Sequence, residues 1–354
     1  MGEPSHSALF ENAISVTPID STTYSANLDP QWCIGQVPHG GYTASIFYRA
    51  AAVHFANNFT HRFSNPPQPI ALQITYLRRT TIGPAILKIQ NTKIGSRVST
   101  IHVSLLQLPD GVALSGAISK DSKLEVKAAA YINTSPPDTE GGPSYNGTWE
   151  LGPAPVPGTR SDGLVDLLAL AKNKRDGAWV EFPLLSPVMA AMRNLEVYAP
   201  NLLMSASLET RANQVVDQWV RFTPGGKVAR WSNEAVMFLV DIFPAGLDRL
   251  AAMESHRLLS EDVPHREAPE NAAAKDNFWY PTVSLNIDLK TRLPIEGVEW
   301  LYSRVVTRKV QGSRADLDVV VLDQMGDLVA TSTQVALVVD ASRNSKGRDS
   351  GGKL

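Results

Sequence analysis

Apolar and polar residues alternate along several segments in the first third of the chain. Val103 and His102, for example, lie on opposite sides of one such segment, and each has similar neighbours two residues away. A period of two residues predicts β-strands that bury one face. Asp110-Gly111 is a hairpin signal between two of these segments. The predicted strands are residues 17–28, 70–79, 85–92, 97–108 and 112–118.

A different pattern follows the first of these strands. Residues 43–52 are rich in alanine and come directly after Gly40-Gly41. This composition predicts a helix that starts at the glycines. Because glycine has no Cβ, another backbone or a ligand can approach the start of the helix, where free N–H groups lie. We infer a buried helix wrapped by an antiparallel sheet.

Residues 136–163 break this regularity. They contain six prolines and six glycines, and no apolar period continues through them. Such a stretch is typical of a linker between domains.

The pattern of the first half returns 217 residues later. Ten of the 23 ungapped positions in 95–117 are identical at this offset, beginning with Gly95-Ser96-Arg97 against Gly312-Ser313-Arg314. Average residue usage would give about one or two identities. The preceding segment also recurs, with 69–78 matching 281–290. This period is too long for a solenoid, so we predict two copies of one domain.

In the second copy, Trp231, Ala235 and Phe238 have helical spacing, which predicts the counterpart helix over 230–245. Its other predicted elements are strands over 179–182 and 202–222 and an insertion loop over 253–276. The predicted organisation is an N-terminal domain over 1–135, the linker over 136–163, a C-terminal domain over 164–341 and a disordered tail over 342–354.

Composition narrows the class of protein. Hydrophobic residues make up 43% and charged residues 19%, with a net charge of −2, an ordinary globular balance. No basic stripe indicates nucleic acid, and no run of about 18 apolar residues indicates a membrane span. The single cysteine, Cys33, allows neither an internal disulfide nor a cysteine-based metal site. We expect a cytoplasmic protein, with peroxisomal import as an alternative because the chain ends in Gly352-Lys353-Leu354.

One helix cradled by a curved antiparallel sheet, repeated in tandem, resembles the double-hotdog fold. The Gly40-Gly41 turn looks like that of the acyl-CoA thioesterase II family within the hotdog superfamily. Residues 328–334 are similar to the last-strand motif of this family, and 237–241 to the helix that ends in its catalytic aspartate. The resemblance covers most of 15–340. It implies an α+β tandem double hotdog that is thioesterase-like, of the type found in fungal natural-product pathways.

The resemblance also implies catalytic roles for Asp241, Gln334 and Ser284, with Thr282 two residues from Ser284 on the same face. A carboxylate near the end of a buried helix can take a proton from water as a general base. The other side chains would hold that water, and backbone N–H groups at a helix N-terminus would stabilise the oxyanion. Asn286-Ile287 stands where the family has an acidic-histidine pair, which leaves the reaction type open.

The repeat predicts a single active site for the two copies. The positions that match Asp241, Ser284 and Gln334 in the first copy are Ala50, Leu72 and Ala117. Polar residues in one copy face apolar residues in the other, as expected when only one copy keeps the chemistry.

Several other residues are candidates for contact with a substrate. The glycine turn and the aromatic residues of the second helix give this set: His39, Gly40, Gly41, Tyr42, Trp231 and Phe238. His39 is interpreted as a turn or pocket residue, because the chain has no G-x-S-x-G nucleophile elbow to accompany a histidine base. Cys33 is interpreted as a buried small hydrophobe. For Arg97 and Arg314, a contact to a coenzyme A phosphate and a structural salt bridge both stay open.

The leading hypothesis is an acyl thioester hydrolase that needs no cofactor and no metal. One alternative is a hotdog dehydratase, isomerase or cyclase acting on a polyketide-like intermediate, and another is a non-catalytic acyl-binding protein. The expected partner is a small acyl substrate such as a coenzyme A thioester, with no nucleic acid and no membrane. Because the family usually pairs, we also expect a homodimer.

Overall fold

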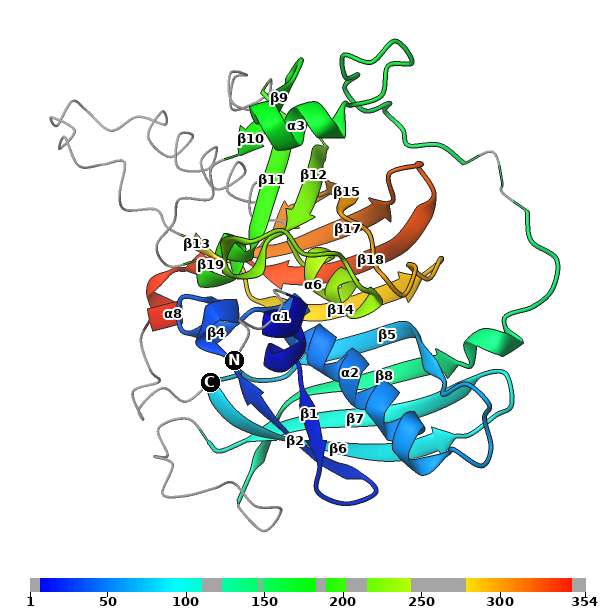
Figure 1. Cartoon of the computed structure of the whole chain (residues 1–354). Coiled ribbons are helices and arrows are strands. Elements are labelled where there is room, and N and C mark those ends of the chain that lie inside the picture. The colour runs from blue at the N-terminus through cyan, green and yellow to red at the C-terminus, as the bar shows by residue number, and fades with distance from the viewer. Residues whose placement is uncertain are drawn as a thin grey trace, which may run out of the picture.

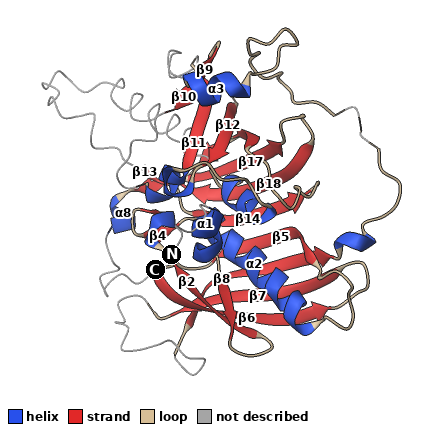
Figure 2. Ribbon diagram, viewed as in Figure 1, coloured by secondary structure: helices blue, strands red, loops and turns tan. Residues whose placement is uncertain are grey.

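A single large antiparallel sheet runs through both halves of the molecule (Figures 1 and 2). The computed structural model describes residues 7–109, 123–145, 147, 149–182, 189–201, 215–242 and 278–345. Within these residues the sheet has 15 strands, and α2 lies across the sheet of the first half. The predicted α+β double hotdog is confirmed.

Most of the described elements are strands of this sheet, and α2 is the longest described helix. The strands of the first half are β1 Val16–Pro18, β2 Thr23–Leu28, β5 Gln68–Tyr76, β6 Gly83–Lys93, β7 Ser99–Gln107 and β8 Glu125–Ser135. Those of the second half are β9 Arg175–Asp176, β10 Trp179–Phe182, β11 Leu195–Pro200, β12 Val216–Phe222, β14 Thr282–Leu289, β15 Trp300–Val306, β16 Val310–Gln311, β17 Arg314–Leu322 and β18 Leu328–Leu337. Two small two-stranded sheets pair β3 Cys33–Ile34 with β4 Val37–Pro38, and β13 Phe278–Trp279 with β19 Val339–Asp340. The α-helices are α1 Ser7–Ala13, α2 Gly40–Asn58, α3 Leu167–Asn173, α6 Asn233–Leu239 and α8 Ser342–Ser345, and 3-10 turns cover Pro30–Trp32, Pro137–Thr139, Ala190–Asn194 and Pro224–Gly226.

The two halves repeat one strand order outward from a central pair. From the centre, the first half runs β5, β8, β7, β6, β2, β1, and the second runs β14, β18, β17, β15, β12, β11. β5 and β14 join the halves as antiparallel neighbours, with Ile74 opposite Leu285 and Leu72 opposite Ile287. These four side chains belong to one buried core. The prediction of two copies of one domain is therefore confirmed.

The register shows that the repeat offset of 217 is wrong by one residue within the strands. β7 and β17 each shift register against their neighbour once, at Leu105/Leu106 and at Val321/Leu322. Matching these bulges gives an offset of 216, which pairs the buried Val103 with the buried Val319. An offset of 217 would pair it with Val320 on the opposite face, because side chains alternate along a strand. The identities at 217 therefore do not mark structurally equivalent residues in these strands.

Other expected elements differ in the structure. The strand predicted over 17–28 is two strands, β1 and β2, which pair with each other. The strand that corresponds to β18 is β8, which was not predicted. The predicted strand 112–118 and insertion 253–276 lie outside the described residues, as do 202–214 of the strand predicted over 202–222 and the end of the helix predicted over 230–245. The described helix is shorter than predicted: it starts at Asn233, after the N-cap Ser232, and ends at Leu239.

The tail predicted to be disordered from 342 contains α8. Its Asn344 donates a hydrogen bond to the Ile34 oxygen at 2.9 Å and accepts one from the Gln36 N–H at 3.1 Å. These contacts attach the end of the described chain to the loop that precedes His39. Residues after 345 lie outside the described part.

The proline-rich linker packs against the second half. Trp179 Nε1 donates to the Val156 oxygen at 2.9 Å, and Arg304 donates to the Pro153 oxygen. The domain limits stay predictions, since the sheet itself is continuous. Among the described helices, none combines the length and the apolar character that crossing a bilayer requires.

Candidate active site

Helices α2 and α6 pack against each other where the two halves join. A Cβ on Gly41, at the start of α2, would lie 2.7 Å from the carbonyl oxygens of both Met237 and Phe238 in α6. One turn further along α2, Ser45 Oγ donates to the Glu234 oxygen at 2.8 Å. The helices therefore run antiparallel in close contact. As the sequence predicts, the glycine permits the close approach of another backbone.

Asp241 follows α6 and points at the start of α2. Its Oδ2 accepts the Gly41 N–H at 2.7 Å, and its Oδ1 accepts the Thr282 hydroxyl at 3.0 Å. A Cβ on Gly40 would lie 2.5 Å from the same Oδ2, so a larger residue would displace the carboxyl group. Burial raises the pKa of Asp241 from 3.8 to about 7, against the lowering effect of the two hydrogen bonds. The carboxyl group is thus poised to exchange a proton near neutral pH.

His39 lies beside Asp241 and caps α2. Its Nδ1 accepts the Gly41 N–H at 3.2 Å and lies 3.6 Å from Asp241 Oδ2. Burial lowers the pKa of His39 to about 3, so the ring is neutral and carries its proton on Nε2. The ring packs edge-on against Phe238, with 5.0 Å between centroids. The predicted pocket residues His39 and Phe238 therefore both adjoin the aspartate.

Thr282, and not Ser284, is the hydroxyl that contacts Asp241. A β-bulge separates the two residues: Thr282 pairs with Ala336, whereas Ser284 pairs with Val335. Opposite residues share a face, so Thr282 lies on the buried inner face with Ala336 and Ser284 lies on the outer face. The expectation that both occupy one face is wrong because the bulge inserts one residue. Ser284 therefore does not face Asp241.

Gln334 lies on the inner face of β18, next to Ala336. That position is diagonal to Thr282 across the strand pair, a separation of about 7–8 Å between backbones. The side chain is buried, and neither its oxygen nor its nitrogen has a hydrogen-bond partner in the described part of the chain. An unpaired buried amide is rare and suits a group that binds a ligand.

The sequence gives no warning of Tyr76, which also adjoins the site. Its hydroxyl donates to the Gly40 oxygen at 2.7 Å. Burial, together with the nearby charge of Asp241, raises the pKa of Tyr76 well above its usual value. Tyr76 lies at the end of a strand whose exposed positions are polar, so only the fold distinguishes it from a surface residue.

Tyr42 and Trp231 have packing roles in place of the predicted substrate contacts. The Tyr42 hydroxyl donates to the Ala13 oxygen at 2.7 Å and accepts the Asp29 N–H at 3.1 Å. Trp231 Nε1 donates to the Val220 oxygen at 3.1 Å. Both rings are fully buried. Neither hydrogen-bonding group is directed at Asp241.

The two halves allow a direct comparison with the equivalent position of the first copy. Counted from the two helix N-caps, Asp241 corresponds to Tyr48. By the matching bulges in β5 and β14, Thr282 corresponds to Pro69. The predicted counterparts were therefore misplaced. By the matching register shifts, Ser284 is equivalent to Ala71 and not to Leu72. Gln334 is equivalent to Ile132 and not to Ala117, which lies outside the described residues.

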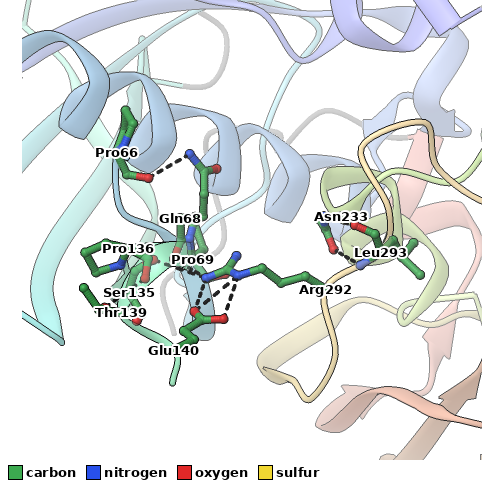
Figure 3. Close-up of polar contacts among 10 residues, drawn as sticks. All are labelled: Pro66, Gln68, Pro69, Ser135, Pro136, Thr139, Glu140, Asn233, Arg292 and Leu293. Atoms are coloured by element: carbon green, nitrogen blue, oxygen red, sulfur yellow. Dashed lines mark hydrogen bonds and ion pairs between the residues drawn. The ribbon is translucent and has the colours of Figure 1, made fainter. Parts of the chain in front are cut away.

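We call the two equivalent places corners: one holds Asp241 and Thr282, and the other holds Tyr48 and Pro69. Arg292 lies at the second corner, beside Pro69 (Figure 3). Its guanidinium donates to the carbonyl oxygens of Gln68, Pro69 and Ser135 at 3.4, 3.5 and 3.2 Å and to the Glu140 carboxylate at 2.5 to 3.2 Å. The corner that holds Asp241 in one half thus holds a partly exposed ion pair in the other.

Two further candidates have structural surroundings. Burial raises the pKa of the Cys33 thiol to about 12, which disfavours the nucleophilic thiolate. Arg97 donates to the Gly141 oxygen at 3.1 Å, on the surface.

Comparisons with known proteins show the family of this chain. The family model for the acyl-CoA thioesterase C-terminal domain matches residues 168–338, and that for the N-terminal domain matches residues 28–120. The thioesterase-like protein TwmA of Talaromyces wortmannii is 33% identical, with 98% of this chain and 96% of the relative aligned. The chain belongs to the double-hotdog thioesterase-like family.

More distant proteins are also similar to this chain, one in sequence and two in structure. The ustilagic acid biosynthesis cluster protein orf2 of Mycosarcoma maydis is 22% identical over 89% of this chain and 79% of its own length. A hotdog-fold protein from Alicyclobacillus acidocaldarius has a TM-score of 0.62 at 16% identity, covering 93% of this chain and 97% of the other. The acyl-CoA thioesterase II TesB2 of Mycobacterium marinum has a TM-score of 0.52 at 14% identity, covering 94% and 99%. These structures support the fold.

Proposed function

We propose that this chain hydrolyses acyl thioesters with the Asp241 carboxylate as general base. The proposal depends on one observation: a carboxyl group with a pKa of about 7 is buried at the junction of the halves and is held through both oxygens. A general base is most effective when its pKa lies near the working pH. Near neutrality a substantial fraction of Asp241 is therefore ionised and able to accept a proton from water.

The neighbouring side chains supply the remaining steps. Water positioned by Asp241 and Thr282 gives its proton to Asp241 while its oxygen attacks the thioester carbonyl. The unpaired amide of Gln334 donates to the carbonyl oxygen as negative charge develops there. One such donor typically lowers the barrier by about 3 kcal/mol. Asp241 then returns the proton to the departing sulfur, which leaves as a thiol.

The relatives support the substrate class. One is named thioesterase-like and another belongs to a biosynthesis cluster. We therefore propose an acyl thioester of a natural-product pathway, carried by coenzyme A or by a carrier protein. A homodimer stays a prediction.

A second candidate is dehydration of a 3-hydroxyacyl thioester, which the His39–Asp241 pair favours. The neutral imidazole would remove the proton next to the carbonyl through Nδ1, the nitrogen that carries no proton, in place of its contact with the Gly41 N–H. A protonated Asp241 would give its proton to the hydroxyl at the next carbon, which leaves as water. The two groups lie 3.6 Å apart, and their opposite pKa shifts keep His39 neutral and Asp241 protonated between about pH 3 and pH 7.

The pH dependence and the products separate the two candidates. Hydrolysis needs ionised Asp241, so kcat/KM for thiol release rises with pH, is half-maximal near pH 7 and is level above it. Dehydration needs protonated Asp241 and therefore declines above pH 7, with no thiol released. A 3-hydroxyacyl-CoA substrate, followed by a thiol reagent and by mass spectrometry, reports both. If neither thiol nor enoyl product forms at any pH, both candidates are excluded.

A further inference from the structure

Two serines are buried on the inner face of the second half of the sheet. Ser332 in β18 and Ser303 in β15 are 3% and 0% exposed. Neither hydroxyl has a hydrogen-bond partner among the residues that the structure describes. Serine in a strand commonly bonds to nearby backbone, and these two do not. An unpaired buried hydroxyl is unfavourable for the folded state, so its presence calls for an explanation.

Both serines lie on the face that carries the proposed site. Ser332 precedes Gln334 by two residues, so their side chains share the inner face about 6.6 Å apart along the strand. Ser303 lies opposite Gln218 of β12. Gln218 Nε2 in turn donates to the oxygen of Ile242 at 3.3 Å, the residue after Asp241. Ser303, Ser332 and Gln218, the inner polar patch, therefore lie on the face of the proposed site and come from three strands, β15, β18 and β12.

The first half shows that the fold does not require this patch. By the shared registers, Ser332 corresponds to Ala130 and Ser303 to Leu87, both fully or nearly fully buried. Gln218 corresponds to Tyr24, whose hydroxyl is 3.0 Å from His54 Nδ1 and so has a partner. The same positions are thus apolar or satisfied in the half that lacks the carboxylate.

We propose that the inner polar patch binds oxygen substituents on the acyl chain, so that the substrate is a hydroxylated or keto-substituted acyl thioester. This inference rests on the proposed thioester chemistry and names its substrate more closely. Serine hydroxyls both donate and accept, which suits a neutral hydroxyl or ketone. The neighbours opposite the serines, Val319 and Val321, are apolar, and such surroundings disfavour a charged group.

The test compares binding of substituted and plain acyl chains of equal length. The probes are non-hydrolysable thioether analogues of octanoyl-CoA, 3-hydroxyoctanoyl-CoA, 5-hydroxyoctanoyl-CoA and 3,5-dihydroxyoctanoyl-CoA, measured by calorimetry. Wild-type protein should bind at least one hydroxylated analogue about fivefold or more tightly than the plain one, the gain expected for one neutral hydrogen bond. Ser332→Ala combined with Ser303→Ala should abolish that preference and leave the plain analogue within about twofold.

Thr134→Val is the matched control. Thr134 is buried on the inner face of the first half, and its hydroxyl has no hydrogen-bond partner in the described part of the molecule, so its removal should leave the preference unchanged. Equal affinity of the wild type for all four analogues would overturn the inference, and so would a preference that survives the double substitution. Because the readout is binding, it stands apart from turnover. Thiol release without any preference would refute the patch and retain the hydrolase, and a preference without turnover would do the reverse.

Discussion

The two equivalent corners of this molecule differ in the charged groups that they hold. At one, Asp241 holds a buried carboxyl group against the start of α2, with Thr282 beside it. At the other, Tyr48 and Pro69 occupy the matching positions, and Arg292 closes the space with Glu140. The backbone is repeated, including the bulges in β5 and β14. The comparison teaches that the same backbone arrangement can hold a buried carboxyl group in one copy and an ion pair in the other.

The largest effect is expected from replacing the acid itself. Asp241→Asn removes the general base and should lower kcat/KM for thiol release by about 10²–10⁴-fold. Tyr48→Phe, the change at the equivalent position, should leave kcat/KM within about threefold, since that corner has no role in the proposed chemistry. Circular dichroism checks that both variants fold. Equal losses in the two variants would remove the distinction between the corners.

The same replacement should change how stability depends on pH. The folded pKa of Asp241 lies above its unfolded value of 3.8, so its contribution is intact below pH 3.8 and lost as pH rises through about 7. The free energy of unfolding of Asp241→Asn relative to wild type should therefore rise by about 4 kcal/mol from pH 4 to pH 8. Urea denaturation at several pH values measures this. Tyr48→Phe should give a difference that does not vary with pH.

A smaller loss is expected where the helices touch. Gly41→Ala places a methyl group against two carbonyl oxygens of α6 and should destabilise the fold by about 1–3 kcal/mol. Glu234, the equivalent residue of α6, already has a side chain. Glu234→Ala should cost about 1 kcal/mol or less, as for other partly exposed ion pairs. Thermal unfolding distinguishes them, and equal shifts would contradict the close packing at Gly41.

Removing the Thr282 hydroxyl should raise the pKa of Asp241 and lower the reaction rate without abolishing activity. Thr282→Val deletes a hydrogen bond that lowers the pKa of Asp241, so the midpoint of the pH–rate profile should move upward. A hydrogen bond to a charged group is worth about 1.5–3 kcal/mol, or about 10–100-fold in rate if fully used in the transition state. Ser284→Ala, on the outer face, should change neither quantity. An unaltered midpoint in Thr282→Val would show that its bond to Asp241 does not operate in solution.

The smallest effect is expected at the closed corner. Arg292→Ala removes a half-exposed ion pair with Glu140 and three bonds to backbone oxygens, and should cost about 1–2 kcal/mol of stability. Because the corner lies apart from Asp241, kcat/KM for thiol release should stay within about twofold of wild type. A large fall in kcat/KM with little change in stability would assign Arg292 a part in the reaction.

Prediction from sequence succeeded where a local rule applies and failed where register decides. The glycine pair and the alternation of segments such as 97–108 identified α2 and most strands of the first half, because Cβ-free contacts and a period of two are local properties. The period of two places Ser284 and Thr282 on one face, because the bulge between them has no sequence signal. The repeat offset of 217 fails for a similar reason. It is one residue too long within the strands, and a slip of one residue places the matched side chains on opposite faces.

The amino-acid sequence by itself determined that there are two copies, that glycines permit a close approach at the start of α2, and that Asp241 lies close to the end of the second helix. Only the tertiary structure decided which groups meet that carboxyl: His39 and Gly41 from the other half, and Thr282 through a bulge. It also identified the unpaired serines, because burial and missing partners depend on every neighbouring strand. The physical reason is that propensity and pattern act within a few residues, whereas a pKa and a hydrogen bond depend on whatever the fold brings near.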